Sequence, residues 1–120
     1  KYTINVLLRT LNAFSGTGGV AQNDPNKPAV YSLSPNYPNP FNPSTNINFS
    51  LPKDGNVKIN IYNINGQLVA TIFDSFIQSG NYTVTWDGKT NTGAIASSGI
   101  YFYQMRAPNY VVTKKMTLVK

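Results

Sequence analysis

The sequence lacks cysteine, histidine and glutamate altogether. Without cysteine, the chain forms neither a disulfide framework nor a thiolate metal site. Without histidine, cysteine and glutamate, it lacks the most frequent general base, the thiol nucleophile and the acid pair that many glycosidases use. The remaining side-chain carboxylates belong to four aspartates in predicted loops or turns: Asp24, Asp54, Asp74 and Asp87. We therefore expect no enzyme activity and no cofactor.

Charged residues are few, at 12% of the chain, and mostly positive, because ten Lys or Arg stand against four Asp. The net charge of +6 suits an anionic partner such as nucleic acid, lipopolysaccharide or acidic polysaccharide. The basic residues are scattered, however, with Lys114-Lys115 as the only adjacent pair, which is more typical of solubility than of binding. The aromatic stretch 101–103 is better explained as core than as a stacking surface for bases. The sequence thus predicts no nucleic-acid partner.

Long hydrophobic runs are also missing. No stretch has the roughly 20 consecutive apolar residues that span a bilayer, so the chain is predicted not to cross a membrane. At 120 residues with 41% hydrophobic ones, it has the size of a single domain with one core. It begins at Lys1 without Met, which indicates a processed or excised product. Asn, Thr, Ser, Gly and Tyr are abundant, a composition that we interpret as extracellular.

A proline-rich run at 36–43 divides the chain. Its prolines fix φ, remove backbone donors and push the preceding residues toward extended geometry, so the run is neither helix nor central strand. We predict an N-terminal arm at 1–35 and a compact β-domain at 36–120. Tyr37 and Phe41 are expected to be the plugs that seat the run on that domain.

The arm carries an alternating strand pattern at 2–11, with one apolar face formed by Tyr2, Ile4, Val6 and Leu8. The stretch 15–27 is rich in Gly and Asn and is predicted to be a flexible tether. A short edge strand is expected at 30–33. The apolar strand is a candidate partner strand for another copy of the chain. Two alternatives remain open, since it could pair within its own sandwich or be the last strand of a preceding domain.

After the proline run, alternation of apolar and polar residues predicts six strands: 45–51, 56–62, 67–73, 81–86, 100–106 and 111–119. Asn65-Gly66 predicts a two-residue hairpin turn. Trp86 and Tyr101 are predicted core aromatics. No helical periodicity extends over ten or more positions. The fold class is therefore all-β, an immunoglobulin-like antiparallel β-sandwich of about seven strands with an extended strand-bearing arm.

Several segments together resemble the C-terminal sorting domain of the bacterial type IX secretion system, which is itself similar to the Ig-like domain of the flagellar hook-capping protein. The resemblance covers 31–120. The segments are YSL at 31–33, NYPNPFNPST at 36–45, YNINGQLV at 62–69, GNYTVTWDG at 80–88, SGIYFY at 98–103 and KKMTLVK at 114–120.

This resemblance implies a module that directs passage through the outer membrane and often attachment to the cell surface. The implied partners are the secretion machinery or a surface polysaccharide, and the implied location is extracellular or the outer surface of a bacterium. Exposed candidates for recognition are Lys114, Lys115 and Lys120. The signature residues with structural roles are Tyr37, Pro38, Asn39, Pro40, Phe41, Gly66, Trp86, Gly99 and Tyr101. Whether the C-terminal motif serves recognition or only the fold stays open at this point.

Other functions are weaker alternatives. The chain could be a structural subunit of an extracellular filament, assembled by donor-strand complementation through residues 2–11. A carbohydrate-binding module could use a surface built from Tyr62, Tyr103 and Tyr110. A calcium site at Asp87 and Asn91 is weaker still, because one carboxylate is present and Lys89 occupies a ligand position; the alternative is a turn stabilised by the same two side chains.

Overall fold

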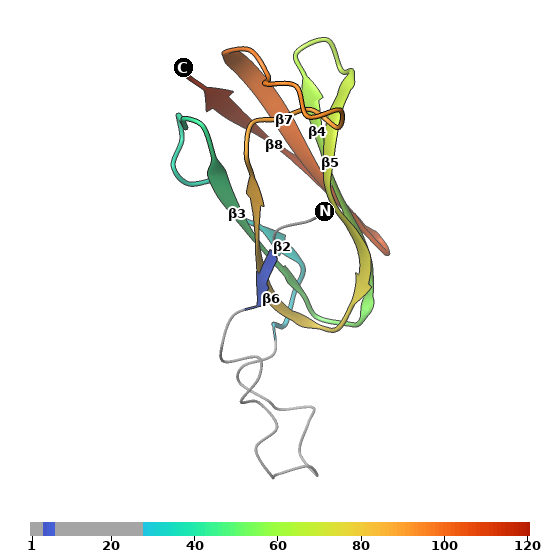
Figure 1. Cartoon of the computed structure of the whole chain (residues 1–120). Coiled ribbons are helices and arrows are strands. Elements are labelled where there is room, and N and C mark those ends of the chain that lie inside the picture. Colours follow the sequence, from blue (N-terminus) through green and yellow to red (C-terminus); the bar gives the residue numbers. More distant parts are fainter. Residues whose placement is uncertain (1–3, 7–27) are drawn as a thin grey trace, which may run out of the picture.

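A computed structural model describes residues 4–6 and 28–120. The described residues form eight strands and contain no helix (Figure 1). The strands are β1 (Ile4–Val6), β2 (Ser32–Leu33), β3 (Thr45–Leu51), β4 (Gly55–Asn63), β5 (Leu68–Ile77), β6 (Gly80–Trp86), β7 (Gly99–Ala107) and β8 (Tyr110–Leu118). Each strand predicted after the proline run is present.

The strands make two four-stranded antiparallel sheets that pack face to face. The first sheet has the order β1-β6-β3-β2 and the second has the order β5-β4-β7-β8. Figure 1 shows the two sheets as separate layers. This arrangement confirms the predicted all-β, immunoglobulin-like sandwich.

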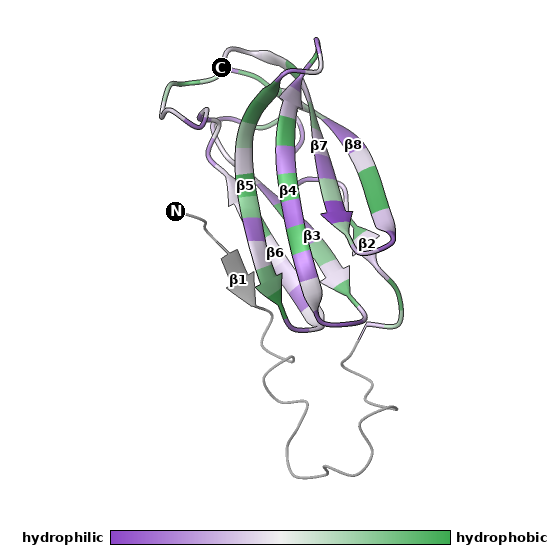
Figure 2. Ribbon diagram, turned by 90° about the vertical axis from the view of Figure 1, so that its right-hand side faces the viewer, coloured by the Kyte–Doolittle hydropathy of each residue, from purple (hydrophilic) through white to green (hydrophobic). Residues whose placement is uncertain are grey.

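The core lies between the sheets and follows the alternation seen in the sequence. Along β4, Val57, Ile59 and Ile61 are buried and alternate with polar residues, of which Asn56 and Lys58 are exposed and Asn60 is buried. Figure 2 shows this alternation as successive bands of opposite hydropathy. The largest fully buried side chains are Trp86, Tyr103, Phe41, Phe49, Ile47, Leu51, Ile59, Ile61, Met105, Met116, Leu118 and Val57. Because inward residues of both sheets meet here, one continuous core holds the domain together.

Strand β5 departs from simple alternation. Phe73 and Thr71 pair with the adjacent residues Ile59 and Asn60, so Ile72 is the extra residue of a β-bulge. The bulge lets Ile72 and Phe73 both point into the core, which explains the consecutive apolar residues in the sequence. The strand also continues to Ile77. Asp74 therefore lies in a strand, and the expectation that it occupies a loop or turn is wrong.

The hairpin between β4 and β5 has a longer loop than expected. The Asn63 N–H donates to the Gln67 carbonyl at 3.0 Å, and the Gly66 N–H donates to the Asn63 carbonyl at 2.9 Å. Only Gly66 takes a positive φ, at 81°, whereas a two-residue type I′ turn needs positive φ at both central residues. The predicted two-residue turn is wrong: the loop has three residues and ends in left-handed glycine.

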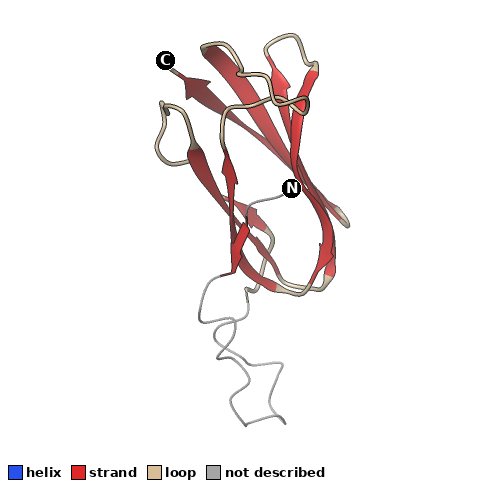
Figure 3. Cartoon of the chain, viewed as in Figure 1, coloured by secondary structure: helices blue, strands red, loops and turns tan. Residues whose placement is uncertain are grey.

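Two short strands join the first sheet from the N-terminal part of the chain. In β2, Ser32 and Leu33 pair with Ser50 and Phe49, and the Leu33 side chain is buried. The described sandwich thus includes residues that precede position 36. In β1, Ile4–Val6 pairs with β6 of the same chain, with Asn5 opposite Thr83. Figure 3 shows strands joined by loops throughout residues 4–6 and 28–120.

Candidate functional site

The proline-rich run connects the two sheets along one side of the sandwich. At the start of the run, the backbones of Tyr37 and Asn46 exchange two hydrogen bonds of 2.9 Å. Asn46 lies near the beginning of β3, in the first sheet. At the middle of the run, the Phe41 N–H donates to the Thr117 carbonyl at 3.0 Å, and the Val119 N–H donates to the Phe41 carbonyl at 2.9 Å. These contacts place Phe41 beside β8 of the second sheet. The run thus joins the beginning of the domain to its last strand.

Phe41 is the plug that the sequence predicts. Its side chain is buried, and its ring lies 5.6 Å from that of Trp86 between centroids. Trp86 in turn meets Tyr101 edge-on at 5.3 Å. Three signature residues from distant segments therefore form one aromatic cluster. Aromatic pairs in this geometry stabilise a core beyond their buried area.

Tyr37 is not a plug, and that expectation is wrong. Its side chain is 78% exposed. The physical reason is its backbone pairing, because residues opposite each other in an antiparallel pair share one face of the sheet. Tyr37 is opposite Asn46, whose side chain is on the outer face of β3 and hydrogen-bonds Thr85 of β6 at 2.6 Å. Tyr37 consequently stands on the solvent side of the first sheet.

Polar side chains hold the run in place, and of these only Asn39 was singled out from the sequence. The buried Asn36 side chain donates to the Pro38 carbonyl at 3.1 Å and to Thr45 Oγ1 at 3.0 Å, and Thr45 Oγ1 donates to the same carbonyl at 2.9 Å. Asn39 Oδ1 accepts the Thr117 N–H at 3.1 Å. The signal for these contacts in the sequence was the presence of polar residues beside prolines. Proline has no backbone N–H, so side chains must supply hydrogen bonds to the carbonyls of a proline-rich run.

The three basic candidates for recognition do not share a face. Lys114 lies opposite buried Tyr103, so it is on the core-facing side of β8, where it is half-buried. Lys115 lies opposite Phe102 on the outer face and is exposed. Lys120 is exposed after the strand, where its N–H donates to Ser98 Oγ at 3.1 Å. Lys115 and Lys120 are therefore the accessible members of the terminal motif.

The tyrosines proposed for carbohydrate binding do not form a common surface. Tyr103 is fully buried, and its hydroxyl donates to the Ser34 carbonyl at 2.8 Å. Burial raises the pKa of Tyr103 above 10.0, and a hydrogen bond from the Asn36 backbone opposes this. Tyr110 stacks on Tyr31 with centroids 5.0 Å apart, while Tyr62 is half-buried on the second sheet. The predicted sugar surface of Tyr62, Tyr103 and Tyr110 is wrong because Tyr103 belongs to the core.

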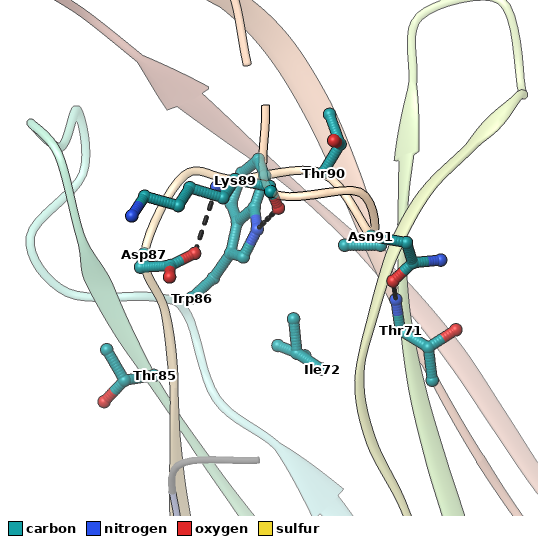
Figure 4. A pocket seen from close by; sticks show the side chains of 10 residues that line it. Thr71, Ile72, Thr85, Trp86, Asp87, Lys89, Thr90 and Asn91 are labelled. Carbon is teal, nitrogen blue, oxygen red and sulfur yellow. Dashed lines mark hydrogen bonds between the residues drawn. The ribbon is translucent and has the colours of Figure 1, made fainter. Parts of the chain in front are cut away.

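A small pocket of about 250 Å³ lies where the loop after β6 approaches β5 (Figure 4). Trp86 Nε1 donates to the Lys89 carbonyl at 2.9 Å, and Asp87 Oδ1 accepts the Lys89 N–H at 3.0 Å. Asn91 Oδ1 accepts the Thr71 N–H at 3.0 Å, and the Asn91 N–H donates to the Val69 carbonyl at 3.0 Å. These bonds fix the loop against the edge of β5.

The two calcium candidates, Asp87 and Asn91, therefore each use a side-chain oxygen for a backbone N–H. Asp87 does so within the turn, as the turn interpretation expects, whereas Asn91 bonds to Thr71 of β5. Within residues 4–6 and 28–120, no three acidic, His or Cys side chains gather where a metal ion could be held. No helix in the same residues is long and apolar enough to cross a membrane.

Comparison with known proteins gives the family. The model of the FlgD Ig-like domain matches residues 38–109, which is more than half of the chain. Among curated proteins, none matches the sequence.

Three solved structures are similar to the chain. One is dimeric latent PorU from Porphyromonas gingivalis, with a TM-score of 0.61 and 23% identity over 77% of this chain and 10% of that one. FlgD from P. aeruginosa has a TM-score of 0.50 and 24% identity over 62% of this chain and 59% of that one. PorZ, a surface component of the type IX secretion system of P. gingivalis, has a TM-score of 0.48 and 17% identity over 88% of this chain and 13% of that one.

The chain thus spans a tenth of PorU and less than two thirds of FlgD, and at these identities the likeness is one of fold. The sequence match over 38–109 is more specific, and it includes most of the proline-rich run, Trp86 and Tyr101. By that match, the chain belongs to the family of FlgD Ig-like domains.

Proposed function

We propose that this domain is a non-catalytic sorting and surface-attachment module of the type IX secretion system, which acts at the outer surface of a bacterium. The proposed partners are the secretion machinery and a surface polysaccharide. The signature segments at 36–45 and 114–120 support this, as does the similar fold within PorU. Lys115 and Lys120 are the proposed recognition residues.

The observation that carries the proposal is the contact between the two ends of the signature. The backbone bonds of Phe41 with Thr117 and Val119 hold the terminal strand against the proline-rich run. Lys115 remains exposed on this supported strand, and Lys120 is exposed just after it. A rigid strand with exposed cations suits recognition by a partner, because little conformational entropy is lost on binding.

A fusion experiment tests this function. The full chain is placed at the C-terminus of a reporter protein in a host that has the type IX machinery, and the reporter is measured in the periplasm, on the cell surface and in the medium. We expect the reporter to leave the periplasm. The double variant Lys115→Gln with Lys120→Gln should reduce export. The double variant Lys53→Gln with Lys89→Gln removes the same charge from exposed positions outside the terminal motif and is the matched control. A wild-type fusion that stays periplasmic would contradict the sorting function.

A second candidate function is a subunit of an extracellular filament. It is favoured by one observation: the edge of β6 accepts Ile4–Val6 as an antiparallel strand. The same edge could accept this strand from a neighbouring copy, and repeated head-to-tail exchange would build a fibre. Of the predicted partner strand, Tyr2 and Leu8 lie outside the described residues, and Ile4 and Val6 are within β1.

Engineered cysteines test strand exchange directly, because the chain has none of its own. Asn5 and Thr83 are opposite each other in the β1 and β6 pair, which suits a disulfide. Chains with Asn5→Cys are mixed with chains with Thr83→Cys and oxidised. Donor-strand assembly predicts mixed dimers, whereas pairing within each chain predicts them only at the level of a control mixture with Lys89→Cys. The chain that carries both substitutions should form an internal disulfide if Ile4–Val6 pairs with β6 of its own chain.

A further inference from the structure

Two positive charges lie side by side on the outer face of the second sheet. Lys58 of β4 is directly opposite Arg106 of β7, and Asp74 of β5 is opposite Lys58 on the other side. Like charges in this cross-strand position destabilise a sheet. The Lys58 Nζ lies 3.9 Å from Asp74 Oδ2, and both side chains are about half exposed, so this ion pair is weak. Two cations and one carboxylate leave this cluster with an excess of positive charge. The β4 and β7 strands that carry the two cations are neighbours in Figure 2.

Two successive side-chain hydrogen bonds on the outer face orient the Arg106 side chain. Its Nε donates to Gln104 Oε1 at 2.9 Å, and Gln104 Nε2 donates to Thr113 Oγ1 at 3.0 Å. The two terminal nitrogens of the guanidinium have no hydrogen-bond partner within residues 28–120. A guanidinium fixed through Nε presents its remaining donors as a planar fork, which matches the two oxygens of a carboxylate.

The cations line a shallow hollow of about 320 Å³. Lys58, Asp74 and Arg106 form its charged wall, and Ala107 and Pro108 contribute apolar surface. On the same outer face, the Phe76 side chain is 63% exposed. A ligand in this hollow therefore meets two cationic hydrogen-bond donors, one carboxylate that accepts hydrogen bonds, and an apolar border.

We propose that this hollow binds an acidic segment of a partner polypeptide, with one Asp or Glu carboxylate of the partner between Lys58 and Arg106. A carboxylate there would relieve the repulsion between the two cations and fill the Arg106 fork. Asp74 would accept a backbone N–H of the segment. Apolar residues beside the acidic one would contact Pro108 and Phe76.

The charges favour a polypeptide over other anionic partners. A nucleic-acid strand presents phosphates in series and no backbone N–H for Asp74, whereas a polypeptide has a backbone N–H next to its acidic side chain. A second copy of this chain is a poor occupant, because the chain has a net charge of +6, only four aspartates and no glutamate. The binding site is separate from the sorting proposal, since it uses neither Lys115 nor Lys120.

Binding is measured with an array of labelled decapeptides. Each peptide has one or two central Glu residues flanked by Leu, Phe or Ala, and each has a counterpart with Gln in place of Glu. The full chain is titrated by fluorescence anisotropy at about 0.15 M salt, where long-range charge effects are screened. At least one Glu peptide is expected to bind roughly ten times more tightly than its Gln counterpart, in keeping with a hydrogen bond to a charged group.

Variants locate the binding to the hollow. Arg106→Gln and Lys58→Gln should each weaken the best peptide by roughly ten-fold. Lys89→Gln removes the same charge from the loop after β6 and should leave affinity unchanged. The melting temperature of Arg106→Gln is expected not to fall, because a like-charge pair is removed, so the loss of binding would be independent of folding.

Three results would overturn the proposal. One is an array in which no Glu peptide binds better than its Gln counterpart. Another is an equal loss of affinity in Lys89→Gln, which would mean that overall charge governs the contact. The third is a single-stranded DNA decamer that binds as tightly as the best peptide and is weakened equally by Lys58→Gln, which would assign the hollow to nucleic acid.

Discussion

Phe41 packs against Trp86 across the sandwich, with ring centroids 5.6 Å apart, and so joins the proline-rich run to the end of β6. Both side chains are about 1% exposed. Through this contact and the backbone hydrogen bonds of Phe41 with Thr117 and Val119, the proline-rich run packs as an integral part of the domain. The family signature is therefore in large part a set of residues that build one corner of the fold.

Truncation of Trp86 should be the most damaging single change in the domain. Trp86→Ala removes the contacts with Phe41 and Tyr101 and the Nε1 bond to the Lys89 carbonyl. We expect a loss of about 3 to 5 kcal/mol in the free energy of unfolding, as for other buried aromatic residues. Urea denaturation measures it. A midpoint within error of the wild type would show that the packing of the Trp86 side chain contributes nothing to stability.

The two aromatics of the proline-rich run should behave differently. Phe41→Ala opens a cavity in the core and should cost about 3 to 5 kcal/mol. Tyr37→Ala changes an exposed side chain and should alter stability by less than about 0.5 kcal/mol. The pair is compared by urea denaturation under the same conditions. Equal losses in the two variants would contradict the outward orientation of Tyr37.

Gly88 and Gly93 provide a matched pair in the loop after β6. Both have positive φ, at 79° and 90°, so alanine at either position is strained. A Cβ at Gly88 would lie 2.8 Å from the Pro43 carbonyl oxygen, whereas nothing lies within 4 Å of one at Gly93.

Gly88→Ala should therefore destabilise the domain by about 1 to 3 kcal/mol more than Gly93→Ala, because only the first adds overpacking to the backbone strain. Thermal and urea unfolding of both variants measure the difference. If the two alanine variants have the same stability, Gly88 does not lie in close contact with the Pro43 carbonyl.

Tyr103 should make stability depend on pH under alkaline conditions. Burial raises its pKa above 10.0 in the folded domain, while the unfolded chain titrates near that ordinary value. Between the two pKa values the folded state holds more protons than the unfolded state, so stability falls as pH rises above about 10. The neutral hydroxyl also donates to the Ser34 carbonyl at 2.8 Å.

Tyr103→Phe should thus cost about 1 kcal/mol at neutral pH through the lost hydrogen bond and flatten the decline above pH 10. Urea titrations from pH 7 to about 11 measure both effects. Tyr37→Phe serves as the control for an exposed hydroxyl. An unchanged alkaline slope in Tyr103→Phe would assign the decline to other groups, among them Tyr82, whose pKa is raised by burial and by Asp54.

Local pattern was enough to place the strands but not to orient every side chain. The predicted strand 45–51 coincides with β3, and its inward residues Ile47, Phe49 and Leu51 are buried as alternation requires. The orientation of Tyr37 was missed because it depends on pairing with Asn46. The burial of Tyr103 was missed for the sugar surface, although alternation places Tyr103 on the same face of the strand as Tyr101, which was predicted to lie in the core.

The sequence by itself determined the fold class, the strand positions and most of the core, because a period of two residues and the backbone limits of proline and glycine act locally. Only the tertiary structure decided which distant residues meet. It joins Phe41 to Trp86 and the terminal strand, and it places Lys58 between Asp74 and Arg106. Register between strands that are far apart in the chain sets these contacts, and that register comes from the packing of the whole sandwich.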